Sequence, residues 1–169
     1  ERIDLVIDFS KYKGERFKLI NMDLPEDENL GVIMEFRVTK RLKGDDKSKV
    51  PEMLYPEEHL DEAMAERVRE LPLSASQDHS GRPMLLLDGK MWNNPVTETP
   101  MLDSIEIWKF INTTPFPHPI HVHLVQFRIL SRQAYDVERY LNGEGLHLIG
   151  EPVPPRDFEK GWKDTVKAE

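Results

Sequence analysis

The segment Phe116–Leu124 contains three histidines and constrains the fold of this chain more than any other stretch. Successive side chains of a β-strand point to opposite faces, so His121 and His123 share one face of a strand. His118 precedes them across Pro119, where a regular central strand cannot continue. The pattern therefore predicts a strand that carries two imidazoles on one face and has a third at its entrance.

Imidazole is a suitable ligand for copper, zinc, iron and nickel. Three apolar residues, Val125, Phe127 and Ile129, continue the face of His121 and His123. On such a face, an imidazole whose hydrogen bonds are unmet costs about 1–3 kcal/mol. The pattern therefore predicts a buried metal site whose ligands serve two neighbouring centres. The alternatives are a solvated pair of histidines or a core histidine that is satisfied by ordinary hydrogen bonds.

The sequence His-Pro-Ile-His-Val-His at residues 118–123 resembles the first copper motif of the C-terminal cupredoxin domain in multicopper oxidases. The likeness extends along the chain, and four more segments are similar to bacterial spore-coat laccases of the bilirubin-oxidase type: Arg2–Phe9, Arg82–Leu87, Pro95–Pro100 and Glu159–Thr165. The resemblance implies an all-β fold, a cupredoxin-like Greek-key β-sandwich that is incomplete in this chain. It also suggests the spore coat or the cytoplasm as the compartment, which the residues themselves leave open.

Composition excludes several other classes of function. The chain has 169 residues, enough for one domain or parts of two, and a formal net charge of −8. This acidic balance argues against nucleic acid as the partner. No apolar run approaches the roughly 20 residues that a membrane-spanning helix needs, so no membrane partner is expected.

The chain has no cysteine. This excludes a disulfide framework, and it excludes a complete blue-copper site, which needs a Cys thiolate beside two His ligands. The resemblance implies that this Cys belongs to a later His-Cys-His segment, and that an N-terminal cupredoxin domain with two His-x-His pairs is also missing. We therefore expect an internal piece of a longer oxidase, whose partners are those segments, O₂ and a small aromatic substrate.

Three regions follow from the pattern along the chain. Residues 1–40 predict the closing strands of a middle cupredoxin domain, at 3–9, 17–22 and 32–38. Residues 41–72 predict an interdomain linker with a short helix near 60–71. Residues 73–169 predict the first part of the C-terminal copper-binding domain. Its elements are a hairpin with an Asp-Gly turn at 84–92, a strand at 104–111, a helical turn near 135–140 and a strand that begins at 162–166.

The resemblance assigns a copper centre to each histidine. His118 matches a ligand of the type 1 blue copper, His121 a ligand of the type 2 copper, and His123 a ligand of the type 3 pair. The implied reaction is one-electron oxidation of four phenolic, aromatic or tetrapyrrole substrate equivalents, with reduction of O₂ to two waters. The family's proton-relay acids lie outside this chain, so no catalytic acid or base is assigned.

Other candidate residues lie around the histidines. Thr114, Pro115 and Phe116 precede the type 1 ligand and are expected to line the substrate approach, although Phe116 packing on the surface is an equal alternative. Asp164 is a candidate acceptor that orients an imidazole. The remaining histidines lie in polar stretches without ligand spacing and are interpreted as surface residues: His59, His79 and His147.

Three functions compete for this pattern. The first is part of a laccase-like multicopper oxidase. The second is a non-catalytic β module in which His118, His121 and His123 hold copper or zinc. The third is a cupin, which requires a Glu a few residues after the second His, whereas the first Glu after His123 is Glu138. If the chain is only a piece of the oxidase, it should show no intense blue colour and no turnover by itself.

Overall fold

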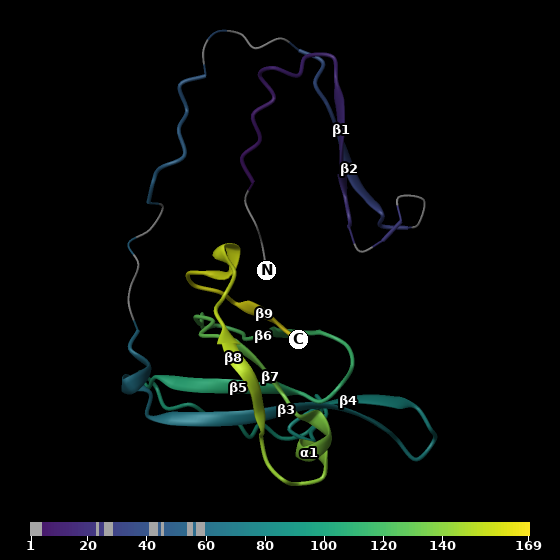
Figure 1. Ribbon diagram of the computed structural model, residues 1–169, viewed down its shortest axis with the longest axis vertical. Coiled ribbons are helices and arrows are strands. Elements are labelled where there is room, and N and C mark those ends of the chain that lie inside the picture. The colour runs from purple at the N-terminus through teal and green to yellow at the C-terminus, as the bar shows by residue number, and fades with distance from the viewer. Residues whose placement is uncertain are drawn as a thin grey trace. The chain divides into compact units, whose positions relative to one another are not determined.

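The computed structural model describes residues 5–22, 24–25, 29–40, 44, 46–53, 56 and 60–169. It divides into two compact units, Arg2–Tyr55 and Pro56–Glu169 (Figure 1). The division lies inside the predicted linker, residues 41–72. The assignment of the two sides to a middle and a C-terminal cupredoxin domain stays a prediction.

The first unit is built on a β-hairpin. Strand β1 (Arg16–Ile20) pairs antiparallel with β2 (Val32–Arg37), and the register places Phe17 opposite Phe36. The ring of Phe9 packs against both, with centroid separations of 5.8 and 5.3 Å. Two of the three strands predicted for this region are thereby confirmed.

The predicted first strand, over residues 3–9, is wrong for its described part. Residues 5–9 have no strand conformation, and the side chains of Leu5 and Val6 are 61% and 80% exposed. Alternating polarity makes a strand only where a neighbouring strand supplies hydrogen bonds. Among the described residues, none forms a strand ladder with this segment.

The second unit holds a three-stranded sheet with the order β4-β3-β5. The long central strand β3 (Arg67–Gln77) runs antiparallel to β4 (Pro83–Leu87) and parallel to β5 (Glu106–Asn112). Its core consists of Leu71, Leu73 and Ile111, which are 2%, 6% and 3% exposed. The Asp88-Gly89 turn after β4 is confirmed: both residues have positive φ, 50° and 69°, as a two-residue hairpin turn requires.

The helix predicted near residues 60–71 is wrong beyond a single turn. A 3₁₀ helix, η1, covers Glu62–Met64, and the chain is already in β3 at Arg67. Arg69, Leu71 and Leu73 are buried in alternation, which is the period of a strand. Seven residue pairs with β5 override the weaker helical spacing of the apolar side chains.

Buried Arg69 joins this sheet to the Pro95–Pro100 segment. Its guanidinium donates to Glu106 at 2.6 and 2.9 Å and to Glu98 at 2.7 Å, and it lies 5.9 Å from the ring centre of Trp108. The hydrogen bond from Arg69 holds the pKa of Glu106 below its ordinary value. The charge is thus fully paired although Arg69 is only 6% exposed.

The remaining elements form two antiparallel pairs and two short helices. Strand β6 (His118–His121) pairs with β9 (Thr165–Ala168), and β7 (Arg132–Tyr135) pairs with β8 (Leu148–Val153) (Figure 1). Helix α1 (Val137–Leu141) confirms the predicted turn near 135–140, and η2 (Asp157–Glu159) is a 3₁₀ turn. Among the described residues, strands thus make up nearly all of the regular secondary structure, which confirms the all-β class. No helix in this described part is long and apolar enough to span a membrane.

Candidate metal centre

Strand β6 presents His118 and His121 to opposite sides. The two residues are three apart in extended backbone, and the ladder with β9 places them opposite Ala168 and Thr165. An odd separation on a strand puts side chains on different faces. The two imidazoles therefore serve different surroundings, although only two residues lie between them.

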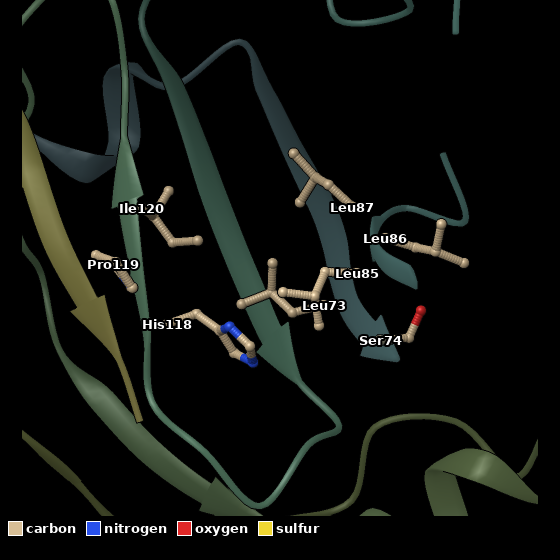
Figure 2. A pocket seen from close by; sticks show the side chains of 8 residues that line it. All are labelled: Leu73, Ser74, Leu85, Leu86, Leu87, His118, Pro119 and Ile120. Carbon is tan, nitrogen blue, oxygen red and sulfur yellow. The ribbon is translucent and has the colours of Figure 1, made fainter. Parts of the chain in front are cut away.

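His118 is half-buried and lies against an open cavity of about 180 Å³. Figure 2 shows its ring pointing from β6 toward Leu73 and Leu85. Its Nε2 lies 2.6 Å from Oγ1 of Thr114, within the loop that leads into β6. The cavity lining consists of Leu73, Ser74, Leu85, Leu86, Leu87, His118, Pro119 and Ile120.

The tautomer of His121 follows from its hydrogen bonds. Nδ1 lies 2.7 Å from the backbone carbonyl oxygen of Asp164 and 3.2 Å from Oγ1 of Thr165. A carbonyl oxygen can only accept, so Nδ1 carries the proton and donates. Nε2 then keeps its lone pair and is free to bind a metal. Metal-binding histidines commonly donate their other ring N–H to a carbonyl in this way.

His123 lies beside His121, with ring centroids 4.8 Å apart and planes inclined at 61°. Both rings are exposed. Since β6 ends at His121, the two histidines do not share one regular strand. Their rings nevertheless lie together, as the spacing predicted.

The prediction of a buried strand face that continues to Ile129 is wrong. After Val122, whose N–H donates to the Asp164 carbonyl at 3.0 Å, the ladder resumes only at the bridge between Phe127 and Lys163. Residues 123–126 therefore loop out against the single residue Asp164. Leu124 turns the chain with φ of 71°, and its side chain is fully exposed.

The other predicted site residues have diverse positions. Pro115 and Phe116 are exposed, and neither lines the cavity beside His118. The hydroxyl of Thr114 contacts His118 instead of facing outward. Asp164 contacts His121 through its backbone carbonyl, while its carboxylate accepts from the hydroxyl of Thr165 at 2.9 Å.

Two histidines outside the motif lie elsewhere in the described part of the chain. His79 is exposed in the turn between β3 and β4. His147 is half-buried, with Nε2 3.0 Å from the carbonyl of Glu144. His59 lies outside the described residues.

Sequence reasoning missed Asn112, the last residue of β5, which is 8% exposed. Its side chain bonds the loop that leads to His118, and its carbonyl accepts from the hydroxyl of Tyr135 at 2.8 Å. Burial raises the pKa of Tyr135, so this hydroxyl stays a donor. The available signal was a polar residue that ends a strand with apolar side chains on both faces.

The donor set fits copper or zinc in ligand type. Within the described residues, no three His, Cys, Asp or Glu side chains come together around one point. His118 is separated by the strand from His121 and His123. Any complete site built on these imidazoles therefore needs ligands from elsewhere.

Comparison with known proteins places these histidines in a segment that is similar to part of larger copper enzymes. The profile of the family described as "Multicopper oxidase" matches residues 66–169. The chain is 44% identical to a laccase of Bacillus subtilis (strain 168) and 39% identical to a laccase of Bacillus stratosphericus, in each case over 99% of this chain and 34% of the relative. It is also 32% identical to the multicopper oxidase LPR1 homolog 1 of Oryza sativa subsp. japonica, over 99% of this chain and 32% of that protein. The chain thus spans about a third of the length of these relatives, and it belongs to the multicopper oxidase family.

Proposed function

We propose that this chain supplies copper ligands to a laccase-like multicopper oxidase, which oxidises small phenolic, aromatic or tetrapyrrole substrates and reduces O₂ to water. His118 is a ligand of the copper that accepts electrons from the substrate. His121 and His123 are ligands of the copper group that reduces O₂. The observation that carries this division is the arrangement around β6. The imidazole of His118 faces the cavity, whereas that of His121 lies on the opposite face of the strand, beside the ring of His123.

Copper, when bound, supplies reversible one-electron chemistry at a fixed site. The chain's own contribution is to hold the imidazoles. The ladder of four residue pairs between β6 and β9 fixes the strand, and the Asp164 carbonyl fixes the ring of His121 with Nε2 available. The short covalent path from His118 to His121 keeps the two groups of ligands at one separation, which favours electron transfer between them.

Substrate contact is proposed for Pro115 and Phe116. Both are exposed, and Phe116 retains 69% of its accessible surface, so its ring is available for an aromatic substrate. Aromatic rings that approach it gain from offset or edge-to-face stacking. Thr114 is not proposed to contact substrate, because its hydroxyl is hydrogen-bonded to the imidazole of His118.

A simple zinc or copper module made of this chain alone has less support. That function needs His118, His121 and His123 to grip one ion, whereas β6 sends His118 to the face opposite His121. The remaining ligands, including the Cys that this sequence lacks, are proposed to come from an N-terminal cupredoxin domain and a His-Cys-His segment of the same oxidase.

Two single substitutions in the full-length protein test the division of ligands. His118→Ala should remove the blue absorption band and stop oxidation of a phenol. His121→Ala should keep the blue band and abolish O₂ consumption. His79→Ala, which changes an exposed histidine outside the site, is the matched control and should leave both unchanged.

Absorption spectra and an oxygen electrode measure these outcomes. Equal loss of the blue band in both variants would contradict the division between two centres. Phenol oxidation at the wild-type rate by His118→Ala would contradict the role of His118 as a ligand. A blue band from the 169-residue chain alone would contradict the need for an outside Cys.

A further inference from the structure

We propose that Asn112 and Thr114 are positioning residues that fix the tautomer of His118, so that its Nδ1 is the nitrogen left for copper. This inference rests on the proposed function for the identity of the metal. The tautomer itself is argued from hydrogen bonds within the chain.

The first step is the orientation of the Asn112 amide. The backbone N–H of Thr114 donates to Oδ1 of Asn112 at 3.1 Å, which identifies that atom as the acceptor. The Nδ2 group donates to the carbonyl of Phe116 at 2.8 Å and lies 3.5 Å from the carbonyl of Ala168 in β9. The orientation of the amide is therefore fixed, because a backbone N–H can only donate and a backbone carbonyl can only accept.

The second step concerns the hydroxyl of Thr114, which has one hydrogen to donate. Its Oγ1 lies 2.9 Å from Oδ1 of Asn112 and 3.1 Å from the Phe116 carbonyl, and neither oxygen carries a hydrogen. If Thr114 donated to His118, both oxygens would face its lone pairs with no hydrogen between. The set is satisfied only when Thr114 donates to an oxygen, most directly Asn112 Oδ1, and accepts from His118.

The third step follows for the imidazole. With Nε2–H donating to Thr114 across 2.6 Å, Nδ1 of the neutral ring has the lone pair. An acceptor on the far nitrogen fixes the ring and raises the basicity of the ligating one. The anchor is rigid, because Asn112 is buried at the end of β5 and its carbonyl is held by Tyr135.

Nitrogen NMR of the metal-free, full-length protein with labelled histidine reads the tautomer directly. The His118 signal should show Nε2–H in the wild type and a mixture of tautomers in Thr114→Val, which removes only the hydroxyl. Thr114→Ser restores a hydroxyl and should restore Nε2–H. Thr113→Val is the matched control, because the Thr113 hydroxyl bonds the Leu73 carbonyl, which keeps the Thr113 N–H as a donor.

Copper(I) titration against a competing chelator, on the same variants, gives a second readout. Thr114→Val should bind copper at the His118 centre about 10- to 100-fold more weakly, and the reduction potential of that centre should rise. The Ser variant and Thr113→Val should stay near the wild type. A wild-type His118 with its proton on Nδ1, or a tautomer and copper affinity that are unchanged in Thr114→Val, would overturn the inference.

The two proposals fail in different ways. A Thr114-dependent Nε2–H signal in a protein that binds no copper would overturn the proposed function and leave the hydrogen-bond device standing. If the protein binds copper and shows a blue band, but the tautomer of His118 does not depend on Thr114, only the inference about Asn112 and Thr114 is overturned.

Discussion

The two loops that flank β6 are held in different ways. The loop before it, residues 113–117, is tied inward: Asn112 bonds two of its residues, and Thr113 donates to the Leu73 carbonyl through both its N–H and its hydroxyl, at 3.0 and 2.7 Å. The loop after it, residues 123–126, lies on the surface and turns through a left-handed leucine, Leu124. The candidate ligands on and beside β6 are therefore held to different degrees.

The difference shows how each imidazole is positioned. His118 is oriented by side chains that reach back to the buried sheet, and His121 by a backbone carbonyl of β9. Among the described residues, the ring of His123 contacts the ring of His121. Hydrogen bonds thus orient the two imidazoles on β6, from a side chain at one end of the strand and from a backbone carbonyl at the other.

The largest expected effect is at the anchor of the first loop. Asn112→Leu should lower the stability of the full-length protein by about 3 kcal/mol, because the Thr114 N–H loses its partner and the Phe116 carbonyl loses the nearer of its two donors in a part-buried loop. The thermal unfolding midpoint measures this loss. Asn93→Ala, at an exposed asparagine in the loop after β4, is the control and should leave the midpoint unchanged. Equal midpoints for wild type and Asn112→Leu would show that the first loop is no more firmly held than the second.

A smaller effect on stability is expected from the ion pair of Arg132 and Glu159, because Arg132 also bonds β9, the partner strand of β6. Arg132 donates to the Lys167 carbonyl at 3.1 Å and to both carboxylate oxygens of Glu159 at 2.9 and 2.5 Å. Glu159→Gln should cost about 1–2 kcal/mol at neutral pH, since it weakens charge-assisted bonds that are largely screened from solvent. Glu144→Gln, in an exposed pair with Arg139, should cost less than about 0.5 kcal/mol.

The pH dependence of that pair has a definite sign. The hydrogen bond from Arg132 holds the pKa of Glu159 below its ordinary value of 4.5. A lowered folded-state pKa gives stability that is present above the unfolded pKa and is lost as pH falls through the folded one. The difference in unfolding midpoint between wild type and Glu159→Gln should thus be constant above about pH 5 and shrink below 4.5. A difference that grows on acidification would contradict the pairing.

The family resemblance implied the all-β class. The residues themselves predicted the Asp-Gly turn and the helical turn at α1, because each of these depends on local chemistry. The sequence also predicted that His121 and His123 lie together, since two residues of extended chain suffice for that. It failed where the outcome depends on distant partners. The helical spacing near Met64 lost to the pairing of β3 with β5, and the apolar alternation after His123 lost to the loop opposite Asp164.

Within the site, the sequence could identify ligand types but not their supports. Asp164 was expected as an acceptor that orients an imidazole, and the acceptor in the structure is its backbone carbonyl, which any residue has. Asn112 was overlooked because its partners are backbone groups and one threonine hydroxyl. The sequence could have marked Asn112 as a polar residue at the end of an apolar strand, but its backbone partners were identified only by the structure.

Replacing Leu124 by glycine should stabilise the second loop, residues 123–126, although the loss of a leucine side chain would destabilise a packed loop. Leu124→Gly removes a fully exposed side chain from a residue with φ of 71°, which costs a non-glycine residue about 1 kcal/mol or more. After the larger chain entropy of glycine is subtracted, we expect the unfolding midpoint to rise slightly. Val125→Gly, at the next residue of the same loop but without positive φ, should lower it. A lower midpoint in Leu124→Gly would mean that this leucine packs against a part of the protein beyond the described residues.

The smallest expected effect separates backbone from side-chain support at His121. Asp164→Ala keeps the carbonyl that accepts from Nδ1 of His121 and removes only the carboxylate, which bonds Thr165. Copper affinity at the O₂-reducing centre should therefore change by less than about twofold, against the 10- to 100-fold typical of lost ligand-orienting groups. Copper(I) competition on the full-length protein, beside Thr114→Val, measures both kinds of support on one scale. If Asp164→Ala weakens copper as much as Thr114→Val does, the carboxylate acts on the imidazole after all, and the contrast between a side-chain support before β6 and a backbone support at its end is wrong.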